Sequence, residues 1–157
     1  MITVLCFGNE WHGDDGFGME IYKKLKTTPL PDYVNVIFSG TNSLLAWKEV
    51  INSSYVILVD ACQREETDDL PGSLHWSNPE MFSKTQQRNL HDGGLEELIR
   101  HREILSQGQK LPTLEILFVY IDSITAFHKG LSNSVKASIP LAVDMIIKQI
   151  QAKESML

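Results

Sequence analysis

The stretch MITVLCFGNEWHGDDGFGME, residues 1–20, decides how this chain begins to fold. Residues 2–7 predict a buried strand. Gly8-Asn9 ends that strand, because glycine takes positive φ freely and asparagine tolerates it. The next loop brings the adjacent carboxylates Asp14 and Asp15 to the start of an expected helix, whose N-terminal dipole keeps carboxylates ionised. The loop therefore lies past the carboxyl end of a first strand, where open α/β sheets place their functional sites.

This loop has two other possible interpretations. A phosphate-binding loop does not fit, because glycines at positions 8, 13, 16 and 18 match neither G-x-G-x-x-G nor G-x-x-x-x-G-K-[ST], and two aspartates would repel phosphate. Helix capping remains open, with Asp14 as N-cap and Asp15 in the first turn. Gly16 and Gly18 carry no side chain, so we expect room for a large ligand to approach there.

Length and composition describe a single domain spanning residues 1–157. The net charge of −6 argues against nonspecific binding to nucleic acid. The chain shows no signal-peptide pattern and no run long enough to span a membrane, so a cytoplasmic protein is expected. Cys6 and Cys62 are interpreted as small buried residues in a reducing compartment.

Further strands are expected at residues 33–38, 55–59, 73–77 and 114–121. Helices are expected at 43–51, after residue 91, and from Ser132 as N-cap to about Lys153, with a kink or break at Pro140. The helix at 43–51 should turn Leu44, Leu45, Trp47 and Val50 inward. This alternation predicts an α/β fold, a three-layer α/β/α sandwich on a mostly parallel twisted sheet of about five strands. The strand at 73–77 is the candidate for an antiparallel edge.

Two further residues stand out. Asp60 follows the apolar run 55–59. Because burying an unpaired carboxylate is costly, packing in the core does not explain an aspartate at this position. The alternative is that Asp60 caps the following turn. His91 directly precedes a helix that carries Leu95 and Leu98, where the alternative is an ordinary polar loop residue.

In a doubly wound sheet Asp15 and Asp60 can converge at one carboxyl edge. Together with His91 they make a mixed oxygen and nitrogen ligand set that leaves coordination positions open, as catalytic or exchanging metal sites do. Ligand type alone does not choose among zinc, manganese, iron and nickel.

From residue 1 to about 148 the chain resembles the hydrogenase maturation proteases. The resemblance rests on F-G-N-E-W-H-G-D-D-G-F-G at residues 7–18, on Val59-Asp60-Ala61 after a buried strand, and on His91 opening a later helix. Secondary agreements are Gly40-Thr41, Pro71-Gly72 and the stretch G-L-S-N-S-V at residues 130–135. One departure is Phe38-Ser39, where some members place an acidic residue before the Gly-Thr step.

The resemblance implies an endopeptidase that removes a C-terminal extension from the precursor of a nickel–iron hydrogenase large subunit after nickel insertion. It implies that Asp15, Asp60 and His91 are both the catalytic residues and the metal ligands. They would detect nickel carried by the substrate, without a permanently bound cofactor. The expected partner is the large-subunit precursor, with no nucleic acid or membrane, and the protein is expected to be a monomer.

Two mechanisms remain open. In the first, the metal polarises the scissile carbonyl or lowers the pKa of an attacking water. In the second, Asp15 and Asp60 work as an aspartic-protease-like pair whose pKa values are split, although the usual D-[TS]-G signature is absent. A covalent nucleophile is not indicated, since the chain has no G-x-S-x-G elbow. The competing classes are a nonproteolytic nickel-binding escort, a plain α/β interaction domain and, least favoured, a nucleotide-binding module.

Overall fold

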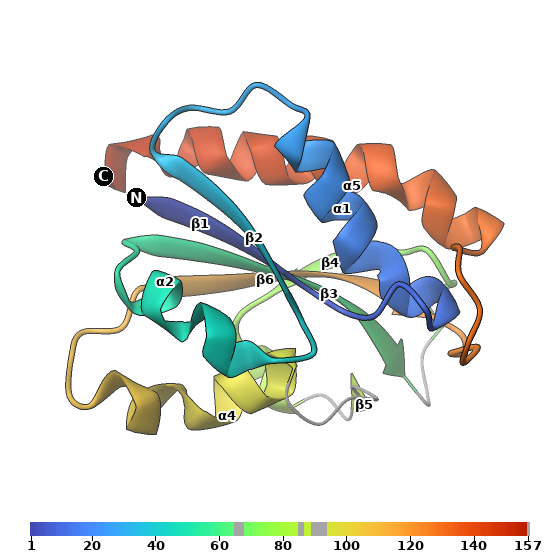
Figure 1. Ribbon diagram of the computed structural model, residues 1–157, viewed down its shortest axis with the longest axis horizontal. Coiled ribbons are helices and arrows are strands. Elements are labelled where there is room, and N and C mark those ends of the chain that lie inside the picture. The colour runs from blue at the N-terminus through green and yellow to red at the C-terminus, as the bar shows by residue number, and fades with distance from the viewer. Residues whose placement is uncertain (65–67, 85–86, 89–93, 157) are drawn as a thin grey trace.

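A twisted sheet runs through the middle of the computed structural model, with helices on both of its faces (Figure 1). The structure describes residues 1–64, 68–84, 87–88 and 94–156. In these residues the strands are β1 (Ile2–Phe7), β2 (Val34–Gly40), β3 (Tyr55–Arg64), β4 (Leu74–Ser77), β5 (Gln87–Arg88) and β6 (Thr113–Ile121). Their order across the sheet is β2-β1-β3-β6-β4, and the short β5 pairs with β3.

The sheet confirms the predicted fold class. β1 pairs in parallel with β2 and β3, and β3 pairs in parallel with β6. β4, which covers most of the strand expected at 73–77, is the antiparallel edge strand and pairs with β6. The chain leaves β1 for one side of the sheet and β3 for the other, so the β1–β3 boundary is the point where open α/β sheets bind ligands.

The helices divide between the two faces. α1 (Phe17–Lys26) and α5 (Asn133–Ala152) pack on one face, and α2 (Trp47–Ile51), α3 (Pro79–Lys84) and α4 (Leu95–Ser106) pack on the other. Single 3-10 turns are η1 (Gly13–Gly16), η2 (Ser43–Ala46) and η3 (Glu154–Met156). In the described residues no helix is both long enough and apolar enough to cross a membrane.

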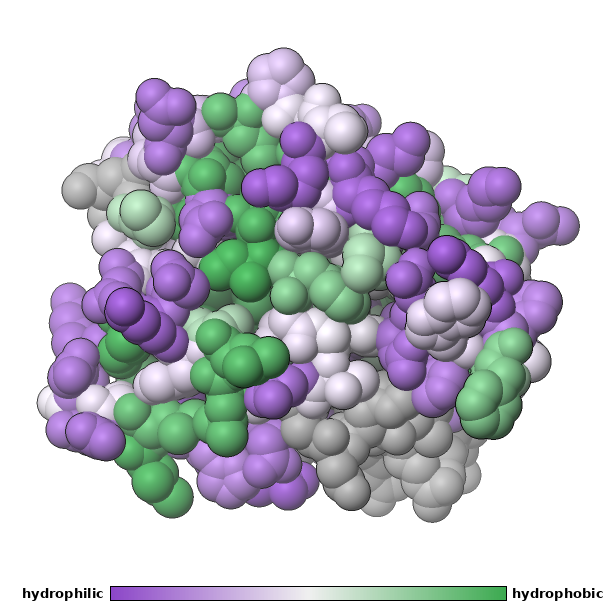
Figure 2. Space-filling model, in the orientation of Figure 1, coloured by the Kyte–Doolittle hydropathy of each residue, from purple (hydrophilic) through white to green (hydrophobic). Residues whose placement is uncertain are grey.

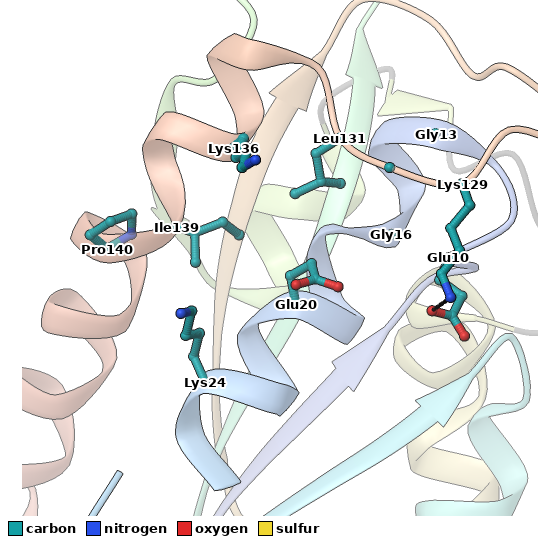
Figure 3. A pocket seen from close by; sticks show the side chains of 11 residues that line it. Glu10, Gly13, Gly16, Glu20, Lys24, Lys129, Leu131, Lys136, Ile139 and Pro140 are labelled. Carbon is teal, nitrogen blue, oxygen red and sulfur yellow. Dashed lines mark ion pairs between the residues drawn. The ribbon is translucent and has the colours of Figure 1, made fainter. Parts of the chain in front are cut away.

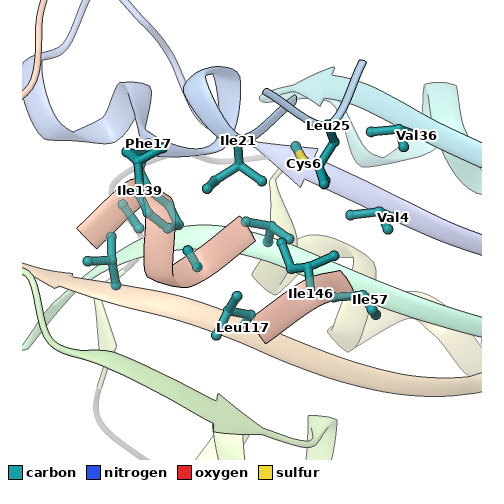
Figure 4. Close-up of a cluster of buried hydrophobic side chains, with 14 of the residues drawn as sticks. Val4, Cys6, Phe17, Ile21, Leu25, Val36, Ile57, Leu117, Ile139 and Ile146 are labelled. Atoms are coloured by element: carbon teal, nitrogen blue, oxygen red, sulfur yellow. The ribbon is translucent and has the colours of Figure 1, made fainter. Parts of the chain in front are cut away.

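β3 explains why the sheet is covered on both faces. Its residues alternate between two cores: Ile57 and Val59 join the cluster under α1 and α5, whereas Leu58 joins the cluster under α2 and α4. Figure 4 shows the first cluster, with Phe17 and Ile21 of α1 and Ile139 and Ile146 of α5 packed over the strands. Burying an aliphatic or aromatic side chain contributes about 1.5–3 kcal/mol, so the all-apolar run 55–59 fits a central strand.

The segment 43–51 differs from the prediction of one helix. It is a 3-10 turn followed by one short α-helix, and Leu44 and Leu45 are 61% and 77% exposed instead of facing inward. The buried residues of the turn are Ser43 and Ala46, because side chains three apart eclipse one another in a 3-10 helix. Val50 is buried as expected.

α5 runs from Asn133 to Ala152 with Pro140 inside it, so the helix has no break at the proline. Its predicted inward stripe is present in the buried residues Val135, Ile139, Ala142, Ile146 and Ile150.

Candidate active site

The loop between β1 and η1 folds back so that Asp15 returns to the end of β1. Gly8 has a φ of +119°, and a Cβ at this position would lie 2.1 Å from the carbonyl oxygen of Asp15. The backbone N–H of Asn9 donates to Asp15 Oδ2 at 2.8 Å and to the Asp15 carbonyl oxygen at 3.1 Å. Glycine is therefore required at residue 8, and the Gly8-Asn9 turn holds Asp15 in place.

Gly18 does not provide the open space expected for a ligand, whereas Gly16 lies at the edge of a pocket. A Cβ on Gly18 would lie 1.9 Å from the carbonyl oxygen of Phe7, and one on Gly16 would lie 3.2 Å from the Cα of Glu10. The prediction of an open approach is wrong for Gly18, because α1 packs its own backbone against the end of β1 there.

Asp14 does not cap a helix. Neither η1 nor α1 has a side-chain hydrogen bond at its N-cap. Instead, the carboxylate of Asp14 accepts hydrogen bonds from the backbone N–H of Ser132 at 2.6 Å and from Ser132 Oγ at 2.8 Å. Ser132 occupies the N-cap position of α5, but its hydroxyl donates to Asp14 and makes no capping hydrogen bond. The interpretation of Asp14 as an N-cap is therefore wrong, although Asp15 does lie in the first turn of η1. Asp14 instead joins the acidic loop to α5.

Asp60 lies inside β3 and not after its end, so the alternative that it caps a following turn is also wrong. The last residue of β3 that pairs with β1 is Val59, opposite Cys6, whereas pairing with β6 continues past Asp60. Asp60 is thus the first residue of β3 that β1 no longer covers. Strand alternation puts its side chain on the face of Leu58, the side of α4, although the residue is only 5% exposed.

Electrostatics place Asp60 beside Asp15. Burial raises the pKa of Asp60 well above its usual range, and the carboxylate of Asp15 raises it further. The backbone N–H of Ala61, which donates to Asp60 Oδ1 at 2.8 Å, lowers this pKa in part, and the carboxylate of Glu96 raises it. The structure therefore brings together two of the three predicted site residues. Burial and the neighbouring carboxylates therefore favour the protonated form of Asp60 over a wider pH range than in a solvated aspartate.

The third predicted residue, His91, lies outside the described residues. Within the part of the chain that the structure describes, no group of three or more ligating side chains is placed to hold a metal ion. Glu96, in the first turn of α4, is a neighbour of Asp60 that sequence reasoning did not single out. The sequence did contain a signal for Glu96, because this carboxylate follows His91 by five residues and lies in the helix predicted after residue 91.

A second loop braces the acidic loop from outside. The backbone N–H of Gly13 donates to the carbonyl of His128 at 2.7 Å, and that of His128 donates to the carbonyl of Trp11 at 3.0 Å. The ammonium of Lys129 lies 5.0 Å from the centre of the Trp11 ring, a distance typical of a cation–π contact. This bracing leaves Trp11 56% exposed and Phe127 94% exposed.

Exposed apolar side chains are also present near β2. Figure 2 shows hydrophilic side chains over α1 and hydrophobic ones gathered below it, over β2 and the segment of η2 and α2. Leu44 and Leu45 belong to this segment. Large exposed apolar side chains grouped on one face are typical of surfaces that contact other proteins.

The comparisons with known proteins agree with this geometry. Residues 19–149 match the family model of the hydrogenase maturation proteases. A Methanocaldococcus jannaschii protein whose name assigns it to the hydrogenase maturation proteases is 26% identical, over 96% of each chain. The hydrogenase-maturating endopeptidase HybD from E. coli has the same fold, with a TM-score of 0.82 and 23% identity over 98% of this chain and 93% of that one.

A hydrogenase 2 maturation peptidase from a Thaumarchaeota archaeon also aligns, with a TM-score of 0.69 and 28% identity over 96% of this chain and 97% of that chain. The family model covers most of the chain, including most of α1, β3 with Asp60, β6 and nearly all of α5. This chain belongs to the hydrogenase maturation protease family, and its activity is that of a protease in hydrogenase maturation.

Proposed function

We propose that the protein removes a C-terminal extension from a nickel–iron hydrogenase large-subunit precursor once nickel is in place. Asp15 and Asp60 contact the nickel that the precursor carries, and His91 completes the ligand set. The nickel arrives with the substrate and leaves with the product, so the protein keeps no resident metal.

One observation carries this proposal: a buried carboxylate, Asp60, sits next to a second carboxylate, Asp15, at the switch point of the sheet. Two neighbouring carboxylates in a poorly solvated place repel each other, and the single backbone donor from Ala61 offsets this only in part. A divalent cation between them would reverse the sign of that interaction. Carboxylate oxygens with an imidazole nitrogen are ligands that nickel accepts.

The chemistry at this site is peptide-bond hydrolysis. Nickel supplies a positive charge that polarises the scissile carbonyl or an attacking water. Water adds to the carbonyl carbon, the C–N bond breaks, and the extension leaves as a free amine after gaining a proton. In the aspartic-type alternative, Asp60 donates a proton from its raised-pKa carboxyl and Asp15 accepts the proton of the attacking water. The two routes differ in whether cleavage requires nickel.

The test is a processing assay with purified precursor, read by mass spectrometry of the precursor's C-terminus. Wild-type protein should shorten the nickel-loaded precursor and leave the nickel-free precursor intact. Asp15→Asn, Asp60→Asn and His91→Ala should each abolish shortening while the far-UV circular dichroism spectrum stays native. Asp144→Asn, which changes an exposed aspartate on α5, is the matched control and should cleave normally.

The outcomes separate the candidate functions. Equal cleavage of nickel-free and nickel-loaded precursor would favour the aspartic-type route and remove the nickel requirement. A precursor that gains nickel but never becomes shorter would instead indicate the nonproteolytic escort. Full cleavage by any one of the three variants would remove that residue from the site.

A further inference from the structure

A pocket with a volume of about 550 Å³ lies between α1 and α5, and Asp14 and Asp15 are not among its lining residues (Figure 3). Gly13 and Gly16, the two ends of η1, form part of its lining. Its size falls within the range of about 300–1,000 Å³ that is usual for ligand pockets. The acidic turn that carries Asp15 therefore borders both the candidate active site and this pocket.

The pocket has an apolar side. Leu131, Ile139 and Pro140 line it, all from α5 or the residues just before it. Figure 3 shows Lys24 reaching from α1 and Lys136 from α5, below and above Ile139 in that view. An apolar wall between two ammonium groups suits a ligand that has a hydrophobic part and a negative part.

The acidic side chains of the pocket are paired with lysines, whereas two of its lysines have no acidic partner among the described residues. Its two glutamates are already paired: Lys23 Nζ lies 2.8 Å from Glu20 and 3.5 Å from Glu10, and Lys129 Nζ lies 3.6 Å from Glu10. No ion pair within 4.0 Å joins Lys24 or Lys136 to a carboxylate of the described residues. In a chain with a net charge of −6, this pocket therefore presents two unneutralised cations.

Pro140 leaves one backbone carbonyl of α5 without its usual donor. A proline has no backbone N–H, so the carbonyl of Lys136 lacks the donor that residue 140 would otherwise give it within α5. Lys136 and Pro140 both line the pocket. A ligand that offers an N–H, a carboxylate and an apolar side chain matches these three features together, and this combination is characteristic of a peptide and not of a simple phosphate.

We infer that the pocket between α1 and α5 binds a carboxylate-bearing apolar peptide segment, with Lys24 and Lys136 pairing with the carboxylate. This inference rests on the proposed function for the identity of the peptide, which is the part of the precursor next to the cleavage site. The carboxylate is either the C-terminal one or that of an acidic side chain. Binding there would anchor the precursor while its nickel lies against Asp15 and Asp60.

The direct test measures binding, without cleavage. The probes are a fluorescein-labelled hexapeptide of leucine, aspartate and glutamate with a free C-terminus, its C-terminal amide, and an analogue without a peptide carboxylate, in which asparagine, glutamine and a C-terminal amide replace the acidic groups. The proteins are the wild type, the Lys24→Gln/Lys136→Gln double variant, and a Lys26→Gln/Lys148→Gln control that removes exposed lysines from the same two helices outside the pocket.

The wild type and the control should bind the acidic probe, whereas the pocket variant should bind it about fivefold more weakly for each lysine removed. Loss of binding on amidation assigns the contact to the terminal carboxylate, and retained binding assigns it to an acidic side chain; both support the inference. Equal binding of the analogue without a peptide carboxylate, equal binding by the pocket variant, or no binding to either acidic probe would overturn it.

Processing kinetics separate this inference from the proposed function. The pocket variant should raise KM for the precursor and leave kcat near the wild-type value, because it alters binding away from the reacting bond. If the wild type shortens the precursor but the pocket variant has an unchanged KM, the pocket inference is wrong and the proposed function stands. If the wild type never shortens the precursor, the proposed function fails, and the peptide-binding result still decides the pocket.

Discussion

Asp14 and Ser132 are 118 positions apart in the sequence, and two hydrogen bonds join them, one from the backbone N–H of Ser132 and one from its hydroxyl. This contact ties the turn that carries Asp15 to the first residue before α5. Because the carboxylate is the acceptor in both bonds, each is charge-assisted and stronger than a neutral hydrogen bond. The position of the acidic turn therefore depends on a residue near the other end of the chain.

The first prediction concerns this contact. Ser132→Ala removes the hydroxyl donor but keeps the backbone donor, so we expect the free energy of unfolding to fall by about 1–2 kcal/mol. For a domain of this size that corresponds to a decrease in Tm of about 2–8 °C. Thermal unfolding followed by circular dichroism measures it. Ser134→Ala, which changes an exposed hydroxyl 3.2 Å from that of Ser132, is the control, and an equal decrease in both variants would contradict the prediction.

The second prediction concerns the close packing of α1 on β1. In Gly18→Ala the new Cβ would lie 1.9 Å from the carbonyl oxygen of Phe7, so α1 must shift away from the strand. We expect a loss of about 3 kcal/mol or more in urea unfolding, because the obstructing atom belongs to the backbone and cannot move aside. Gly94→Ala is the control, since no atom lies within 4 Å of a Cβ at that position. A Gly18→Ala variant as stable as the control would be inconsistent with the observed packing.

The third prediction concerns pH and Asp60. Its pKa is raised in the folded protein, so the stability that its protonated form contributes is fully present below the unfolded pKa of about 3.9 and is lost as pH rises through the folded pKa. Asp60→Asn removes this loss. In metal-free protein the stability of the variant relative to the wild type should therefore increase as pH rises from about 4, and should become constant above the folded pKa of Asp60.

Urea unfolding across that pH range is the measurement. Asp144→Asn is again the exposed control, and it should show a difference from the wild type that does not change with pH. A constant or narrowing difference for Asp60→Asn would mean that its carboxyl is not held protonated. A variant that is more stable but inactive would show that Asp60 is retained for function at a cost in stability.

The fourth prediction concerns the two thiols. Cys6 and Cys62 are both free and fully buried. Burial is the main cause that raises the pKa of each thiol, and the nearby carboxylate of Asp60 raises it further. Since the thiolate is the reactive form, both should react slowly with Ellman's reagent in native protein at pH 8 and rapidly in urea. Precursor processing should be unaffected by prior treatment with iodoacetamide. Fast labelling of the native protein with loss of processing would reopen the question of a cysteine nucleophile.

The sequence by itself determined the elements whose signal is local. β1 has the predicted bounds, the apolar run 55–59 forms the centre of a strand buried on both faces, and the residues after Pro71-Gly72 form the antiparallel edge. These predictions succeed because alternation, apolar runs and glycine turns act on neighbouring residues. The joint placement of Asp15 and Asp60 also followed, since the carboxyl ends of adjacent parallel strands share one edge.

Only the tertiary structure decided what depends on distant partners. Asp14 accepts hydrogen bonds from Ser132 and caps no helix, Gly18 makes room for the carbonyl of Phe7, and a pocket forms where α1 and α5 meet. No local pattern encodes such contacts, because each is fixed by packing between segments that the chain brings together only after folding. The exposure of Leu44 and Leu45 was also not predictable from local sequence. These residues lie in a 3-10 turn, which directs their side chains away from the core that they would face in the predicted α-helix.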